Sequence, residues 1–115
     1  MHRGKKRKFA RVRNQRKALY KALATALIDH GRIRTTLAKA KSVSGFIDKL
    51  VTKAKNDNIT ARRVISQEIG DKATKKLVND IGLKFKDRGG GYTKVLRLGR
   101  RSSDGAEMAI IEFIR

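Results

Sequence analysis

Apolar residues recur with the period of an α-helix early in the chain. Between residues 17 and 28 a leucine stands at every fourth position, as Leu19, Leu23 and Leu27. This spacing places the leucines on one face of a helix. Asn14 is a suitable N-cap, and Gly31 a suitable C-terminal end. The pattern predicts a first helix that ends near residue 30.

A second apolar face runs through residues 37–54. It is formed by Leu37, Ala40, Val43, Ile47, Leu50, Val51 and Ala54. Thr36 precedes this face as a suitable N-cap, and the polar sequence at residues 56–58 ends it. Thr60 and Asp71 each precede a shorter amphipathic stretch, and Gly70 and Gly82 follow where helices commonly end. These patterns predict one long helix and two shorter ones.

The pattern changes to that of β-strands in three places. Residues 32–36 hold Ile33 and two threonines, and residues 92–98 and 106–114 are rich in β-branched and aromatic side chains. The last two stretches predict an antiparallel hairpin with a basic loop. The final stretch is apolar on both faces, so we expect it in the centre of a sheet or under helices. The chain is therefore predicted to be an α+β domain, with about four helices packed on a small three-stranded sheet.

Positive charge is concentrated at the start of the chain. The net charge is +20, and ten Lys or Arg residues precede the first acidic residue, Asp29. Residues 1–13 contain little that could be buried, so we expect repulsion to keep them extended until a polyanion neutralises them. The predicted organisation is a basic arm over residues 1–13 and one globular domain over residues 14–115.

Composition excludes several classes of protein. The chain has no cysteine, which excludes disulfides and thiolate zinc sites and suits a cytoplasmic protein. No apolar run approaches the roughly 20 residues that span a bilayer, so we expect no membrane insertion. An Arg-rich start without acidic residues also fits an organellar transit peptide, but such peptides are rich in serine. The first serine here is Ser42.

No arrangement of residues suggests catalysis. His2 and His30 lie far apart, and the ten carboxylates are scattered without the spacing of an acid–base pair. We therefore expect no catalytic residue, no metal, no cofactor and no small-molecule substrate. The three glycines at residues 89–91 do not complete a nucleotide-binding motif. They serve as a flexible entry to the hairpin, as a close approach for an RNA phosphate, or as both.

The basic residues instead indicate nucleic acid. Phe9 is the only aromatic residue of the arm, which suits contacts to phosphates and RNA shape more than stacking on bases. A DNA-binding protein and an enzyme acting on RNA are the alternatives. The basic residues that we expect to contact RNA are Arg3, Lys5, Lys6, Arg7, Lys8, Arg11, Arg13, Arg16, Lys17, Arg32, Arg34, Lys39, Lys41, Arg88, Arg100 and Arg101.

Residues 23–41 and 48–50, with residues 90–96 and 108–112, resemble the bacterial large-subunit ribosomal protein L17 family. The most specific part is the motif Ile-x-Thr-Thr-x-x-Lys-Ala-Lys, which begins at Ile33 and ends at Lys41. The resemblance covers nearly the whole chain. Its hairpin start and central motif add Thr35, Thr36, Gly90, Gly91 and Tyr92 to the expected RNA contacts.

The resemblance implies a non-catalytic structural constituent of the large ribosomal subunit, with a role in ribosome assembly and translation. It implies an α/β domain with a small mixed sheet. The domain would bind large-subunit (23S-type) rRNA near the outer end of the peptide exit tunnel, beside other ribosomal proteins in the cytoplasm.

Overall fold

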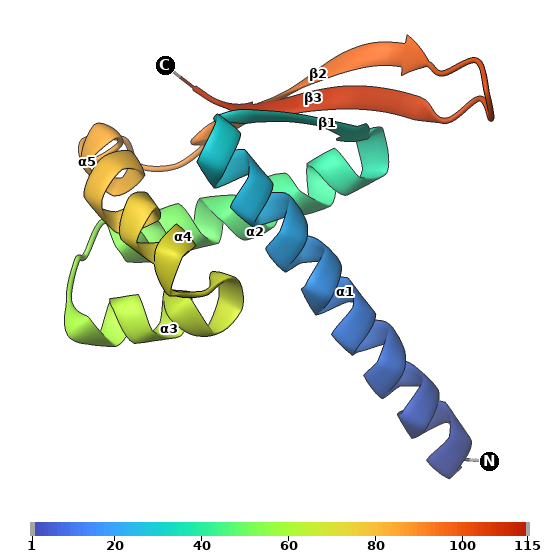
Figure 1. Ribbon diagram of the computed structural model, residues 1–115, viewed down its shortest axis with the longest axis horizontal. Coiled ribbons are helices and arrows are strands. Elements are labelled where there is room, and N and C mark those ends of the chain that lie inside the picture. The colour runs from blue at the N-terminus through green and yellow to red at the C-terminus, as the bar shows by residue number, and fades with distance from the viewer. Residues whose placement is uncertain (1, 115) are drawn as a thin grey trace.

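The structure is a computed structural model that describes residues 2–114, with side chains described from residue 12 onward. In chain order the elements are α1 (His2–His30), β1 (Arg32–Thr36), α2 (Leu37–Ala54), α3 (Ile59–Ile69), α4 (Asp71–Lys76), a π-helical turn (Leu77–Ile81), α5 (Gly82–Lys84), β2 (Thr93–Arg100) and β3 (Glu107–Phe113). The three strands form one sheet, and the helices lie on one side of it (Figure 1). This arrangement confirms the predicted α+β class.

The sheet is antiparallel throughout, so the expected mixed sheet is wrong. The strand order is β1-β3-β2, and both pairs are antiparallel. β1 and β2 run in the same direction but do not pair, because β3 lies between them. The prediction of a central final strand is confirmed.

The expectation of an extended arm is also wrong, because α1 begins at His2. The segment contains no proline, and lysine and arginine have high helix propensity. The helix therefore continues through Asn14, which was expected to cap it. Gly31 ends it as predicted: its φ is 79°, and its N–H donates to the carbonyl oxygen of Leu27 at 2.7 Å.

α2 is the central helix of the core. It runs beneath the sheet, and all seven positions of its predicted apolar face are buried. The N–H of Lys39 donates to the Thr36 hydroxyl at 3.4 Å, which confirms the predicted cap. α1 packs beside α2 through its second half, where Ala24, Leu27 and Ile28 are buried. Leu19, at the start of the predicted apolar face, is 37% exposed, because α1 projects away from the domain there.

α3 and α4 form a helical hairpin that closes the far end of the core. The cap of α3 is Asn58, whose side chain accepts from the N–H of Ala61 at 2.7 Å. Gly70 forms the turn with a φ of 85°. Gly82 packs against the end of α2, where a Cβ atom would lie 3.4 Å from the carbonyl oxygen of Ala54. The absence of a side chain at Gly82 thus lets the start of α5 pack closely against the end of α2.

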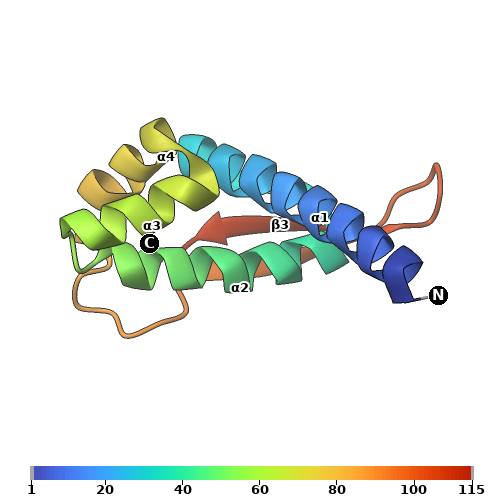
Figure 2. The ribbon, with the colours of Figure 1, turned by 90° about the horizontal axis from the view of Figure 1, so that it is seen from below.

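The molecule has two distinct ends. The first half of α1, the start of α2 and the tip of the β2–β3 hairpin lie at one end, on the right in Figures 1 and 2. α3, α4 and the loop that leads into β2 lie at the other end. We call the first the arm end. We call the second the hairpin end, after the helical hairpin of α3 and α4.

Candidate nucleic-acid interface

The face of the sheet that carries no helix presents cations from two strands. Arg32 and Lys94 stand on either side of Glu112 in register. The Nε atom of Arg32 lies 3.8 Å from Oε2 of Glu112, and Nζ of Lys94 lies 3.2 Å from Oε1. The row therefore carries one net positive charge.

The next row along this face is formed by Arg34, Ile110 and Leu96. Successive residues of a strand point to opposite faces, so Arg34 shares the face of Arg32. Arg34 is exposed, and no carboxylate of the described residues lies within salt-bridge distance of it. It is the cation of β1 whose charge is not compensated.

The central motif places its residues in different roles. Lys39 and Lys41 are exposed on α2, near the arm end. The Thr36 hydroxyl accepts the N–H of Lys39 and so caps α2. The Thr35 side chain is buried, with 9% of its surface exposed. We therefore leave Thr35 out of the proposed RNA surface.

The tip of the β2–β3 hairpin is held by an ion pair. Nε and an Nη atom of Arg101 each lie 2.7 Å from a carboxylate oxygen of Asp104. This contact lowers the pKa of Asp104 and raises that of Arg101, so both stay ionised at neutral pH. The neighbouring Arg100 is exposed and makes no such pair within the described chain. Arg100 thus carries the uncompensated charge of the tip.

The glycine loop before β2 is fastened to the domain. Nε of Arg88 lies 3.0 Å from the carbonyl oxygens of both Gly90 and Gly91. Nζ of Lys55 donates to the carbonyl oxygen of Arg88. Gly91 has a φ of 63°, in the left-handed region that favours glycine. These contacts give the loop a structural role, and part of the Arg88 side chain is used within the protein.

Tyr92 belongs to the core and not to the surface. Only 1% of it is exposed, and its ring centroid lies 5.3 Å from that of Phe85. Its hydroxyl donates to the carbonyl oxygen of Arg88 at 3.2 Å and accepts from Nζ of Lys55 at 3.1 Å. Hydrogen bonds from Thr52 and Lys55 lower the pKa of Tyr92. We leave its side chain out of the proposed RNA surface.

The structure brings only some of the predicted residues together. Arg100 and Arg101 lie at the arm end with the start of α2, whereas the loop of Arg88, Gly90 and Gly91 lies at the hairpin end. Arg13, Arg16 and Lys17 are exposed on the projecting part of α1. The side chains of Arg3, Lys5, Lys6, Arg7, Lys8 and Arg11 lie outside the described part of the chain.

Sequence reasoning missed Lys94. It joins Arg32 and Arg34 on one face only because β3 pairs with both outer strands. The strand pattern around Lys94 predicts which side chains share its face of the strand. It does not indicate which other strand lies next to it.

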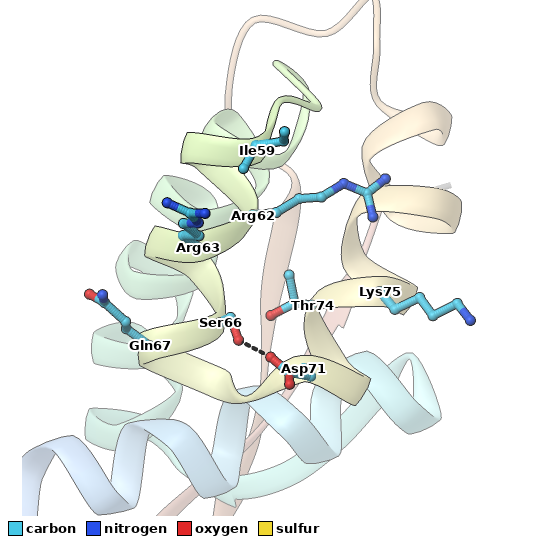
Figure 3. Close-up of a pocket in the computed structure, with 8 residues that line it drawn as sticks. All are labelled: Ile59, Arg62, Arg63, Ser66, Gln67, Asp71, Thr74 and Lys75. Carbon is cyan, nitrogen blue, oxygen red and sulfur yellow. Dashed lines mark hydrogen bonds between the residues drawn. The ribbon is translucent and has the colours of Figure 1, made fainter.

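Among residues 12–114, whose side chains the structure describes, no three His, Asp or Glu residues lie close enough together to hold a metal ion. None of the helices within residues 2–114 is sufficiently long and apolar to cross a membrane. A hollow of about 530 Å³ that is open to solvent lies between α3 and α4 (Figure 3).

A small α+β domain with this excess of positive charge belongs to the class of basic proteins suited to binding a polyanion. Residues 19–114 match the family model of ribosomal protein L17. The chain belongs to the ribosomal protein L17 family, as the sequence resemblance indicated. This membership confirms the prediction of a structural, non-enzymatic protein of the large ribosomal subunit.

Relatives cover almost the whole chain. The large ribosomal subunit protein bL17 of Sulfurihydrogenibium sp. (strain YO3AOP1) is 47% identical over 98% of this chain and 95% of its own length. That of Persephonella marina is 47% identical over 98% and 94%, and that of Campylobacter jejuni is 46% identical over 94% and 93%.

Proposed function

We propose that this protein binds large-subunit rRNA with its arm end, near the outer end of the peptide exit tunnel. There it contributes to ribosome assembly and translation in the cytoplasm. One observation supports this: the projecting part of α1, the start of α2 and the hairpin tip lie at the same end of the molecule. The basic residues gathered there are Arg13, Arg16, Lys17, Lys39, Lys41, Arg100 and Arg101.

The arrangement suits recognition of RNA by its phosphates. These cations come from three separate elements of one fold, so they suit a folded RNA whose phosphates have a fixed geometry. The proposed surface continues through Arg32 and Arg34 on the open sheet face. The tunnel position comes from the family resemblance alone. Neighbouring ribosomal proteins are the other proposed partners.

The test is binding to the large subunit and its rRNA. The tagged protein should co-sediment with large subunits from a bacterial lysate. If the arm end neutralises about 6–10 phosphates, affinity for 23S rRNA should fall by about 10³–10⁵ between 50 and 200 mM salt. Duplex DNA at equal nucleotide concentration should compete weakly. Failure to co-sediment, or affinity that does not change with salt, would contradict the proposal.

A further inference from the structure

The open face of the sheet has an apolar centre beside its cations. Val95 packs against the core, so the next residue of β2, Leu96, points to the open face. Leu96 pairs with Ile110 and lies in the row of Arg34. Leu96 is 43% exposed, and Ile110 is half-buried. Phosphate contacts account for the cations of this face but not for these two apolar side chains.

Cations border this apolar centre on two sides. Arg34 stands on the β1 side, and Lys94 precedes the centre along β2. Glu112 lies between Arg32 and Lys94, and only 20% of its side chain is exposed, so the two cations screen its carboxylate. The three cations and the one carboxylate leave a net positive charge on this border, which suits an anionic partner.

The open sheet face is continuous with the arm end. Strand β2 leads from Lys94 to Arg100 at the tip of the β2–β3 hairpin, and β1 ends at Thr36, where α2 begins. The helices lie on the opposite side of the sheet, so no helix covers this face (Figure 1). An RNA bound at the arm end can therefore extend onto the open sheet face.

The open sheet face presents no aromatic side chain. The three strands contain one aromatic residue, Phe113, which packs against the core with its ring centroid 6.2 Å from that of Phe85. Proteins bind unpaired bases by stacking them on aromatic side chains. The centres of protein–protein interfaces are also enriched in aromatic residues. A double-stranded RNA is therefore favoured over an unpaired strand or another protein.

The minor groove of an A-form RNA duplex is wide and shallow, and it displays ribose groups and base edges beside the phosphates. Neighbouring strands lie about 4.8 Å apart, so the sheet face is roughly 10 Å across from β1 to β2. We infer that the open sheet face docks on the minor groove of an rRNA duplex. Ile110 and Leu96 lie over the riboses, while Arg34 and Lys94 contact phosphates. This inference rests on the proposed binding of rRNA and names the RNA structure that this face contacts.

The experiment uses the full chain within assembled large subunits. The chain has no cysteine, so one introduced cysteine can carry a tethered Fe(II)–EDTA group, whose hydroxyl radicals cleave nearby riboses. Leu96→Cys should cleave both strands of one rRNA duplex, at segments that face each other across its minor groove. Lys39→Cys, at the arm end, is the positive control for rRNA cleavage. Leu83→Cys, 66% exposed in α5 at the hairpin end, should leave that duplex intact.

A second measurement tests the apolar contact itself. Leu96→Ser should lower affinity for 23S rRNA about five- to tenfold, as expected when a half-exposed leucine is no longer buried on binding. The slope of log affinity against log salt should stay the same, because an apolar contact releases no counterions. Leu83→Ser is the matched control and should not change the affinity.

Three results would overturn the minor-groove contact alone. They are cleavage by Leu96→Cys of a single-stranded segment only, no rRNA cleavage by Leu96→Cys beside cleavage by Lys39→Cys, and equal affinities of Leu96→Ser and Leu83→Ser. Failure of the unsubstituted chain to enter large subunits would overturn the proposed function as well.

Discussion

Nζ of Lys55, at the end of α2, lies 3.1 Å from the hydroxyl oxygen of Tyr92, at the entry to β2. The same ammonium group donates to the carbonyl oxygen of Arg88, to which Tyr92 also donates. One buried tyrosine thus connects the central helix, the glycine loop and the hairpin.

We predict that Tyr92→Phe destabilises the protein by about 1–2 kcal/mol, because it removes the hydroxyl from a largely buried hydrogen-bond network. The measurement is the free energy of unfolding in urea. Tyr20→Phe is the control, because the Tyr20 hydroxyl makes no hydrogen bond to another described residue, although its ring centroid lies 5.4 Å from that of Phe46. Equal destabilisation by both variants would contradict a role for the Tyr92 network.

The packing of Gly82 against α2 gives a second prediction. A Cβ atom there would lie 3.3 Å from the carbonyl oxygen of Leu77 and 3.4 Å from that of Ala54. Gly82→Ala should therefore destabilise by about 1–3 kcal/mol, as over-packing does. Gly45, within α2, has nothing within 4 Å of its Cβ position. Gly45→Ala should stabilise by about 0.5–1 kcal/mol through helix propensity, and opposite signs in thermal unfolding would support both assignments.

Removing residues 1–13 should separate binding from folding. The segment holds seven cations, and among the side chains of α1 that the structure describes, the first buried core residue is Ala24. We expect affinity for 23S rRNA to fall by more than about tenfold and its salt dependence to become shallower. The thermal midpoint of the domain should hardly change. A loss of cooperative unfolding would show that the first half of α1 is required for folding.

Arg34 provides a test at the level of one residue. Arg34→Gln should reduce the slope of log affinity against log salt by about one unit, as expected for one lost phosphate contact. Lys72→Gln is the matched control, because Lys72 is exposed on α4 at the hairpin end. Equal slopes for the two variants would argue against Arg34 as a contact of the RNA surface.

Asp48 gives a prediction for pH. Burial raises its pKa, although hydrogen bonds from the Tyr92 N–H and the Thr93 hydroxyl partly offset this effect. The folded state then binds the proton more tightly than the unfolded state. The contribution of Asp48 to the stability of the protein therefore falls as pH rises through the folded-state pKa. Asp48→Asn keeps an acceptor oxygen and removes the charge. Its stability relative to the unsubstituted protein should increase between about pH 3 and 6, as followed by urea unfolding. Asp29→Asn, at an exposed position, is the control, and a constant difference across this range would contradict the argument.

The helices of the core, the three strands and the class of protein can all be predicted from local patterns in the chain. The apolar face of α2 was predicted residue by residue, because a helical period records which side is buried. The charge excess indicated a polyanion, and the motif that starts at Ile33 indicated the family. These properties are local, since each is contained in a short stretch or in the composition.

The order of the strands and the place of each cation follow from how the elements pack together. Placing β3 between β1 and β2 made the sheet antiparallel and put Lys94 on the face of Arg32 and Arg34. The same packing buried Tyr92 and separated the glycine loop from the hairpin tip. These results depend on contacts between residues far apart in the chain, and local periodicity carries no information about such contacts.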